Sequence, residues 1–407
     1  MRNSNSAFRI NADGLSGPIV EDVEIEGGDS AFVFLEATID PNNASNPLIV
    51  EDALQVFTDG GEKSLPVVAW GQDALYIRAD QQVAGIPIKI LDDNTVWTKE
   101  KPIVVYGYAV VDSARSLRIE PGTQVHFHAG AALWVYRYGH IVAEGTIEEP
   151  IVFQSDRLEA FYDEIPGQWD RIWINESDKD HVLKNCVIKN SILGLQIEPA
   201  PLELNIDALT YPNKIFLENI NIRNQSLTAL YARNYNLRAG NVAISNTGGN
   251  SVTILGGGSY ELSHFSVVNF WSQTVRSDPA FFISNSYVDP LNRQQVRQIT
   301  GSFIENSVIA GSEENEFEAL FFEEVSAEFE ARFTAVKSEE ALSGFENRNI
   351  IYQDPKLSGG NVLGWKPQAG SPLINAGLQT QYNQDILGKM RDASPDLGAY
   401  EFDPAGS

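Results

Sequence analysis

The 407-residue sequence has one cysteine, Cys186, and no run of 18 apolar residues. A single thiol cannot close an intrachain disulfide and leaves no cysteine-rich zinc or redox site. Without a long apolar run, no segment is expected to span a membrane. Residues 1–6 also lack the apolar core of a signal peptide. We therefore expect either a cytoplasmic protein or an exported one whose signal has been removed, and the acidic, methionine-poor composition favours the second.

Basic residues are scarce, with 29 Lys and Arg against 55 Asp and Glu and a formal charge of −26. Such a chain is a poor partner for nucleic acid or an anionic membrane. Apolar residues make up 43% of the chain and charged residues 21%, which is ordinary for an ordered protein. The sequence also lacks a phosphate-cradling loop, a Gly-x-Ser-x-Gly nucleophile turn and a His-Glu-x-x-His zinc helix. These absences exclude three common classes of enzyme.

Residues 1–95 have the pattern of short strands separated by turns. Apolar and β-branched runs alternate with Asp-Gly, Gly-Gly and Pro-Asn-Asn turns. This pattern predicts a small β-sandwich. The expected strands cover residues 22–26, 31–39, 48–50, 54–57 and 65–70.

From residue 96 onward the sequence repeats itself. Six segments align without gaps, and their starts are 34, 22, 23, 21 and 21 residues apart. The fourth position is always Ile or Val while the third varies, so one side chain should point inward and its neighbour outward. A period of 21 to 23 residues suits one coil of a parallel β-helix, whose strands stack coil on coil. The fourth positions are Ile188, Ile222, Ile244, Val267, Val288 and Ile309.

The sixth position is Asn in four of these segments, at Asn190, Asn224, Asn246 and Asn269. Asn tolerates a left-handed backbone at a turn, and stacked Asn side chains can hydrogen-bond between coils. We therefore expect a structural ladder rather than a binding row. The 34-residue interval holds an excursion rich in Pro and Leu, Glu198 to Lys214, which should form a loop on the flank.

Two resemblances extend this prediction. The order of Phe8-Arg9-Ile10, Gly28-Asp29-Ser30 and Val67 to Gly71 resembles the immunoglobulin-like accessory domains that precede many bacterial surface proteins. Such domains usually have one or two strands before the counterpart of Phe8, so the resemblance implies a domain truncated at its front edge.

Residues 116–125, 142–146, 150–153 and 167–172 resemble the first coils of secreted bacterial right-handed parallel β-helix proteins. The ending, with residues 370–377, 385–391 and 395–401, is similar to the C-terminal choice-of-anchor segment of such proteins. The likeness implies an exported surface protein, with an outer-membrane lipoprotein as the expected form.

We therefore expect an all-β protein in three parts. Residues 1–95 should form the immunoglobulin-like β-sandwich, residues 96–353 a right-handed parallel β-helix of nine to eleven coils, and residues 354–407 its closing segment.

Candidate chemistry is sparse. The outward positions of the repeats hold no acidic pair of the kind that polysaccharide lyases and hydrolases expose on consecutive coils. The pairs Asp156-Arg157 and Asp170-Arg171 flank a short acidic loop and are weak catalytic candidates. If they lay one coil apart, they could bind a sugar acid or a cation, and otherwise they would be structural ion pairs.

A better candidate is a predicted aromatic strip. His126 and His128 lie two apart on a strand and should share a solvent-exposed face, although without a third ligand they predict no metal site. On the next strand, Trp134 and Tyr136 should face outward, followed by Tyr138. Exposed aromatic strips bind sugars or partner proteins, unless another part of the chain packs over them.

Residues 305–346 hold 12 Glu but only Arg332 and Lys337 as basic residues. Their phenylalanines indicate a folded segment, expected to be partly helical from Glu313 to Glu324. It could attract a divalent cation weakly or a basic partner, although a solvated flank is favoured. No cofactor is expected, with Ca²⁺ as the alternative.

The sequence therefore favours a non-catalytic cell-surface binding or scaffold protein, whose ligand is a glycan or a protein partner. One alternative is a polysaccharide-processing enzyme, a lyase or glycoside hydrolase, acting near Asp156 and Asp170. Another is an assembly subunit of a larger outer-membrane complex, which would dock through the aromatic strip and the β-sandwich.

Overall fold

The computed structural model describes residues 1, 6–38, 48–71, 73–200, 213–362 and 364–404. The described chain is all β apart from one short 3₁₀-helix, η1 (Ala160–Tyr162), and none of its helices is long and apolar enough to cross a membrane. It divides into two compact units, Met1–Leu75 with Glu100–Pro102, and Tyr76–Lys99 with Ile103–Ser407. Most of the predicted excursion from Glu198 to Lys214 lies outside the described residues.

The first unit contains two small antiparallel sheets. One has the strand order β2-β1-β3, and the other is the long hairpin of β4 and β5. A small cluster of Ile10, Ala12 and Leu54 is buried in this unit. The strand expected at residues 22–26 does not form. The strands are β1 (Phe8–Ala12), β2 (Leu15–Gly17), β3 (Val33–Ala37), β4 (Leu48–Thr58) and β5 (Gly61–Gly71).

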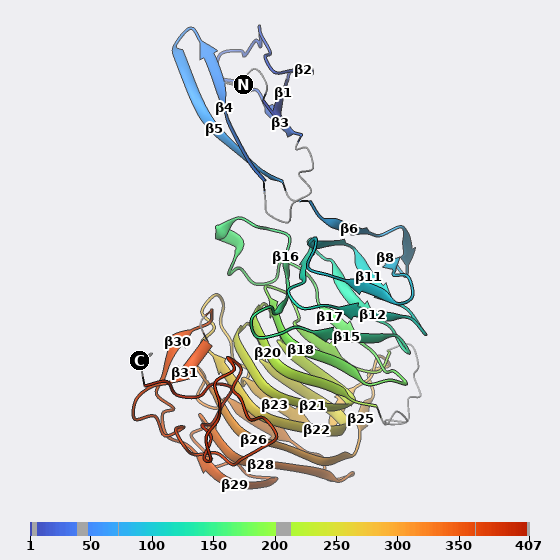
Figure 1. Ribbon diagram of the computed structural model, residues 1–407, viewed down its shortest axis with the longest axis vertical. Helices are drawn as coiled ribbons and strands as arrows, with labels where there is room; N and C mark the ends of the chain where they lie inside the picture. The colour runs from blue at the N-terminus through green and yellow to red at the C-terminus, as the bar shows by residue number, and fades with distance from the viewer. Residues whose placement is uncertain (2–5, 39–47, 72, 201–212, 363, 405–407) are drawn as a thin grey trace. The chain divides into compact units, whose positions relative to one another are not determined.

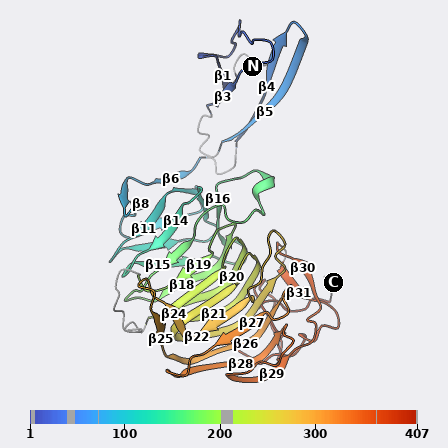
Figure 2. The same ribbon diagram turned by 180° about the vertical axis from the view of Figure 1, so that it is seen from behind.

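The second unit is built from repeated passes of the chain, and strands of successive passes pair in parallel (Figures 1 and 2). The pairs form three ladders, which we name after β10, β11 and β12. The β10 ladder comprises β6 (Leu75–Arg78), β10 (Ile103–Tyr106), β13 (Gln124–Phe127), β16 (Ile151–Ser155) and the later parts of β18 (His181–Lys189), β20 (Ile215–Gln225), β21 (Leu230–Thr247), β22 (Val252–Asn269), β26 (Ile299–Gly311), β28 (Ala327–Val336) and β29 (Glu346–Ile351).

The other two ladders run through the same passes. The β11 ladder comprises β8 (Ile86–Ile90), β11 (Tyr108–Val111), β14 (Ala132–Val135), β17 (Ile172–Ile174), β19 (Leu195–Ile197), the first parts of β21 and β22, β23 (Phe281–Ser284) and β27 (Phe317–Leu320). The β12 ladder comprises β9 (Thr95–Trp97), β12 (Ser116–Ile119), β15 (His140–Glu144), the first parts of β18, β20, β26, β28 and β29, and the middle parts of β21 and β22. Three antiparallel hairpins complete the part of the unit that the structure describes: β7 (Gln81–Val83) with β8, β24 (Ser286–Val288) with β25 (Gln294–Val296), and β30 (Leu357–Gly360) with β31 (Gly364–Pro367).

The boundary between the units falls near residue 75, not at residue 95 as the sequence suggested. β8 and β9 pair in parallel with β11 and β12 of the next pass. Ile88 and Trp97 are buried, with 4% and 1% of their surface exposed. Residues 76–99 thus begin the parallel ladders, because their inward side chains are covered by the pass that follows.

The predicted aliphatic column is confirmed in its main part. Ile188 lies opposite Ile222, which lies opposite Ile244, then Val267 and then Ile309, and all five are at most 1% exposed. The fifth aligned segment is an exception, because Val288 lies in the β24–β25 hairpin and is 61% exposed. Its similarity to the repeat is local, and a single long pass that contains this hairpin as an insertion joins Val267 to Ile309.

The helix expected from Glu313 to Glu324 is also wrong. Residues 317–320 form β27, which pairs in parallel with β23. The ring of Phe317 stacks on that of Phe281, with centroids 5.0 Å apart. Burial of this aromatic pair outweighs the helix propensity of the surrounding glutamates.

Two asparagine ladders hold the corners of successive passes. Asn190, Asn224 and Asn246 have φ values of 68°, 61° and 57°. The Nδ2 of Asn224 donates to Asn190 Oδ1 at 3.1 Å, and that of Asn246 donates to Asn224 Oδ1 at 2.7 Å. The predicted left-handed, mutually bonded row is confirmed for these three, whereas Asn269 bonds Thr247.

The second ladder was not predicted. It uses the first position of the repeat, where Asn185, Asn219 and Asn241 have φ values of 50°, 56° and 54°. Asn219 donates to Asn185 and Asn241 donates to Asn219, both at 2.9 Å, while Asn185 donates to the carbonyl oxygen of Gly145.

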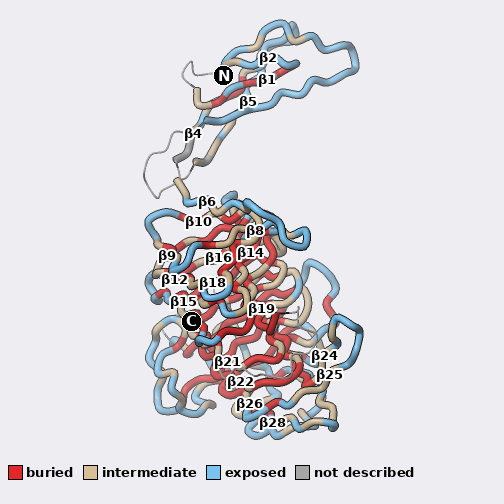
Figure 3. The backbone as a smooth tube through the Cα atoms, turned by 90° about the vertical axis from the view of Figure 1, so that its right-hand side faces the viewer, coloured by how far each residue is buried: buried red, intermediate tan, exposed pale blue. Residues whose placement is uncertain are grey.

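Figure 3 shows where burial is concentrated. The strands of the second unit are buried along most of their length, whereas the first unit is largely exposed. The second unit therefore contains the main hydrophobic core of the described chain.

Candidate functional site

The outward side of the β11 ladder carries a cluster of aromatic side chains, which we call the aromatic flank: Tyr108, Trp134, Tyr136 and Trp173. Trp134 and Trp173 lie opposite each other on β14 and β17, and their rings stack at 4.8 Å with 9° between the planes. The rings of Tyr108 and Tyr136 meet Trp134 edge-on at 6.4 and 5.2 Å. All four side chains are partly exposed. The predicted strip thus exists for Trp134 and Tyr136.

A chain of polar side chains runs beside the flank over successive passes. The hydroxyl of Tyr108 donates to Asp170, whose other oxygen accepts from Arg171 Nε at 2.8 Å. Arg171 also donates to Gln196, and Gln196 donates in turn to Glu198. Together these contacts fix planar polar groups next to the aromatic rings.

The far end of this chain contains a buried ion pair. Glu198 is 4% exposed, and its Oε2 lies 2.6 Å from Arg233 Nη2. Burial raises the pKa of Glu198, although Arg233 and Gln196 act in the opposite direction. Burial likewise raises the pKa of Tyr108, supported by its hydrogen bond to Asp170.

Asn175 fixes the orientation of Trp134. Its Oδ1 accepts from Trp134 Nε1 at 2.8 Å, and its Nδ2 donates to the carbonyl of Glu198 at 3.0 Å. Asn175 is fully buried, and its two hydrogen bonds tie the indole to the two passes that follow that of Trp134. The flank is therefore held in place before any ligand binds.

The two histidines have different environments. The expectation that both face solvent is wrong for His126, which is 6% exposed and has its Nδ1 3.1 Å from the carbonyl oxygen of Ser155. Burial lowers the pKa of His126. His128 has a half-exposed side chain whose Nδ1 lies 2.7 Å from Asp156 Oδ2, and its ring lies 4.7 Å from that of Tyr106.

Tyr138 is exposed but lies past the end of β14, at the next corner. Its ring is 5.2 Å from the guanidinium carbon of Arg137, which pairs with Glu176. It has a left-handed backbone with φ of 61°. We therefore place it at the edge of the flank rather than within it.

The two Asp-Arg pairs do not form one site. Asp156 follows β16 and Asp170 precedes β17, so they belong to two ladders of the same pass rather than to consecutive passes. Asp156 pairs with His128, whereas Arg157 pairs with Glu159 at 3.1 Å. The predicted catalytic cluster is therefore split, and only Asp170 and Arg171 lie on the aromatic flank.

Sequence reasoning missed several residues of this site, namely Tyr108, Trp173, Gln196, Glu198 and Arg233. For Trp173 and Gln196 the signal is the register between passes: Trp134 lies opposite Trp173, which lies opposite Gln196, which lies opposite Tyr231. The intervals between these residues vary, so a search for a fixed period could not align them.

The glutamate-rich segment forms a different feature. Glu313, Glu314, Glu318 and Glu340 border a cavity of about 730 Å³ whose lining includes Phe317. Among the described residues, no group of three or more His, Cys, Asp and Glu side chains is placed to hold a metal ion.

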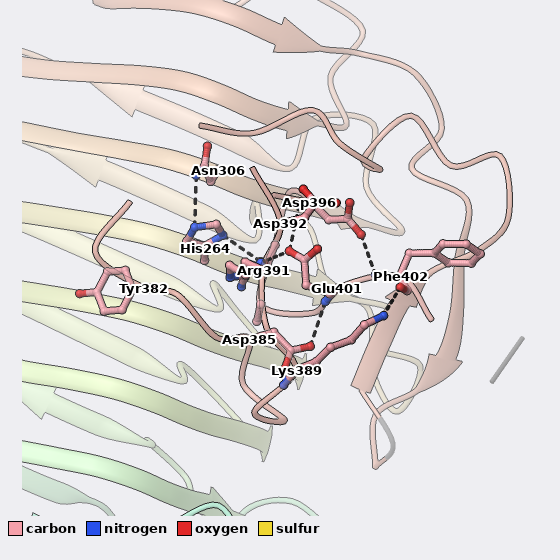
Figure 4. A network of polar contacts seen from close by, with 12 residues as sticks. His264, Asn306, Tyr382, Asp385, Lys389, Arg391, Asp392, Asp396, Glu401 and Phe402 are labelled. Carbon is pink, nitrogen blue, oxygen red and sulfur yellow. Dashed lines mark hydrogen bonds and ion pairs between the residues drawn. The ribbon is translucent and has the colours of Figure 1, made fainter. Parts of the chain in front are cut away.

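The C-terminal motif residues bond to one another and to the ladders (Figure 4). Asp385 accepts from the backbone N–H groups of Leu387, Lys389 and Glu401 at 2.8 to 3.0 Å. Arg391 donates to Glu401 at 2.6 Å and to Asn241, the last asparagine of the second ladder, at 2.9 Å. Burial lowers the pKa of Arg391 and raises that of Glu401.

His264 occupies the next first-position corner after Asn241. It is fully buried, with Nδ1 3.3 Å from the carbonyl oxygen of Gly398 and Nε2 3.2 Å from Asn306 Nδ2. The motif residues of the closing segment thus serve to attach that segment to the parallel ladders.

Fold and site together define an all-β protein of repeated parallel passes, with an aromatic and polar surface on one ladder. No family model matches the chain, and no curated protein is significantly similar to it.

Proposed function

We propose that the second unit is a right-handed parallel β-helix closed by its C-terminal segment. The recurring parallel pairing of equivalent strands supports this architecture, and parallel crossover connections are right-handed in nearly all proteins. We further propose that the first unit is a small immunoglobulin-like sandwich. Its two antiparallel sheets and the buried cluster of Ile10, Ala12 and Leu54 support that assignment.

We propose that the protein is a non-catalytic binding protein of the cell surface and that the aromatic flank binds a glycan. The observation that carries the proposal is the stacked pair Trp134 and Trp173 beside the bonded chain from Asp170 to Glu198. Aromatic rings provide apolar contact for the C–H faces and edges of sugars, and the planar polar side chains beside them can bind hydroxyl groups.

The charge of the chain narrows the class of glycan. A net charge of −26 repels polyuronates and sulfated polymers at long range. On the flank, Arg171 and Arg233 are already paired with Asp170 and Glu198, so no unpaired cation among these groups awaits an acidic sugar. A neutral glycan is the ligand that this site favours.

The cell-surface location and a lipid anchor are part of the same proposal and rest on the resemblance of the coils and the closing segment to exported proteins. A protein partner in an outer-membrane complex is the second form of ligand. The flank would then serve as a docking face, because aromatic residues are enriched in such interfaces.

One observation favours an enzyme instead. Glu198 is a buried carboxyl group whose pKa is raised, as in the general acids of glycoside hydrolases. If the flank cleaves its ligand, Glu198→Gln should abolish the release of reducing ends from a neutral polysaccharide. If the wild-type protein releases none, the flank only binds.

Affinity electrophoresis in gels containing neutral polysaccharides, such as xyloglucan, mannan and β-glucan, tests binding. Trp134→Ala and Trp173→Ala should each reduce the retardation about tenfold or more. Phe270→Ala is the matched control, because Phe270 is 43% exposed and its ring lies 5.0 Å from that of Trp365, away from the flank.

The proposal fails if no neutral polymer retards the wild-type protein, or if Phe270→Ala weakens retardation as much as the tryptophan variants do. Capture of a protein partner that depends on Trp134, without glycan binding, would replace it with the docking role.

A further inference from the structure

A second cavity lies where the closing segment crosses the β12 ladder. It has a volume of about 600 Å³ and is bordered by β20, by β21 and by the segment around Tyr382. This volume is in the usual range for sites that hold small ligands. The residues that argue for a ligand are Phe216, Glu218, Arg238, Gln381 and Tyr382.

An aromatic wall is built into the cavity by a single glycine. A Cβ added at Gly240 would come within 2.0 Å of Cζ of the Tyr382 ring, so only glycine lets this ring lie against β21. Phe216 on β20 lies opposite Arg238 on β21, and Arg238 is two residues before Gly240 on the same strand. Phe216 and Tyr382 thus provide apolar ring surface from two different segments of the chain.

The charged groups at the cavity are balanced. Glu218 pairs with Lys184 at 2.9 Å, and Arg238 pairs with Glu261 at 2.6 Å. Each is 37% to 41% exposed at its side chain, and each keeps further hydrogen-bonding capacity. Neither an anion nor a cation is favoured, because both charges already have partners.

Amide groups complete the lining. Gln381 and Asn383 of the closing segment bring amide groups to the lining, whereas the amides of Asn219 and Asn241 are already bonded within the second asparagine ladder. Carboxylate, guanidinium and amide groups can each make paired hydrogen bonds with adjacent hydroxyls. Their combination with aromatic rings suits a compact, neutral, hydroxyl-rich ligand.

We propose that this cavity binds one neutral sugar unit, with the sugar against Tyr382 and Phe216 and its hydroxyls bonded to Glu218 and Arg238. The site lies on a different ladder from the aromatic flank and does not depend on it. The protein would then have two separate saccharide sites, one for an extended chain and one for a single unit.

Isothermal titration with glucose, galactose, mannose and N-acetylglucosamine tests the inference on the full chain. At least one sugar should bind, and Glu218→Gln and Arg238→Met should each weaken that binding about tenfold. Arg348→Met is the matched control, because Arg348 lies on the same ladder and pairs with Glu330 at 2.7 Å outside the cavity. Chemical-shift changes on binding should map to residues 216–219 and 381–384.

The inference is overturned if none of the four sugars binds, or if Arg348→Met weakens binding as much as Arg238→Met does. It is also overturned if Trp134→Ala abolishes the binding while Arg238→Met leaves it unchanged, since the sugar would then occupy the flank. Loss of polysaccharide retardation in the tryptophan variants with normal sugar titration supports both sites. Sugar binding in the cavity without any retardation of the wild type supports this site and removes the flank proposal.

Discussion

The two units differ in how they bury apolar side chains. In the described part of the first, a cluster of three residues is buried, while seven large apolar side chains are more than half exposed: Leu15, Ile19, Ile25, Phe32, Phe34, Phe57 and Leu65. In the second, inward side chains such as Val105, Phe153 and Ile254 are completely buried. Each pass there is covered by the one before and the one after, so burial grows with every repeat. Two small sheets have no such neighbours, and two stretches that both have the pattern of β-strands therefore give very different cores.

The largest effect on stability is expected from a matched pair of Phe→Ala substitutions, one in each unit. Phe127 is fully buried in the second unit and stacks on Trp169 at 4.2 Å, whereas Phe34 is 69% exposed in the first. Phe127→Ala should destabilise its unit by about 3–5 kcal/mol because it leaves a cavity. Phe34→Ala should change stability by less than about 0.5 kcal/mol. Guanidinium unfolding measures both, and equal losses would contradict the comparison.

Breaking the ion pair of the closing segment should have the next largest effect. The side chains of Arg391 and Glu401 are 3% and 7% exposed, so Arg391→Met leaves a buried carboxylate without its partner. The expected loss is about 3 kcal/mol or more, and Glu401→Leu added to it should restore part of the stability. Arg348→Met, which breaks an exposed pair, should cost at most about 1 kcal/mol in the same unfolding assay. If Arg391→Met costs no more stability than Arg348→Met, the closing segment is not anchored by the pair of Arg391 and Glu401.

Acid should act on one unit more than on the other. All five histidines lie in the second unit, and burial lowers the pKa of His181 to about 4, while Ile141 N–H donates to its Nδ1. Because the unfolded chain takes up this proton first, stability falls as pH drops below about 6.5, by about 2 kcal/mol at pH 5. His181→Leu should flatten the dependence of the second unit's unfolding midpoint on pH between 7.5 and 5. An unchanged slope in that variant would rule out His181 as its source.

The smallest expected difference, about 1 kcal/mol between two variants of Asn224, concerns the first asparagine ladder. Asn224→Ala removes the side-chain hydrogen bonds of Asn224. It also places alanine, which has no side-chain hydrogen bond to offset the strain, in a left-handed backbone with φ of 61°. We expect the two effects to lower the free energy of unfolding by about 2 kcal/mol. Asn224→Gly keeps the backbone freedom and should cost about 1 kcal/mol less. Thermal unfolding of the two variants separates strain from bonding, and identical midpoints would mean that the left-handed backbone carries no cost.

The sequence predicted the parts of the fold that repeat at a fixed spacing. The column from Ile188 to Val267 and the row from Asn190 to Asn246 follow from passes of 22 and 23 residues, once the loop between Ile188 and Ile222 is allowed for. Val288 was misplaced because six residues of a hairpin can match the repeat by chance. The helix at 313–324 was wrong because glutamate propensity is a weak local signal, whereas the stacking of Phe317 on Phe281 joins residues far apart in the chain.

The candidate site was only half predictable. Strand alternation placed Trp134 and Tyr136 outward, but it also turned His126 outward and could not show that this ring would be covered. Trp173 and Glu198 join the flank through pairings across loops of irregular length, which no local pattern records. Asp156 and Asp170 were linked through their neighbours in sequence, although the corner between β16 and β17 separates them.

The insertion before Ile309 has an evolutionary consequence. The chain leaves the stack after β23, forms the β24–β25 hairpin and returns with Val267 still opposite Ile309. Material can therefore be added at a corner while the inward column stays aligned, because an irregularity in the pairing between Gly258 and Glu261 takes up the offset. The body of the stack, in contrast, can gain or lose length only in complete turns. Related genes should differ by whole units of about 22 residues or by decorations at the corners, and each added unit would lengthen the molecule by about 4.8 Å, the distance between neighbouring strands.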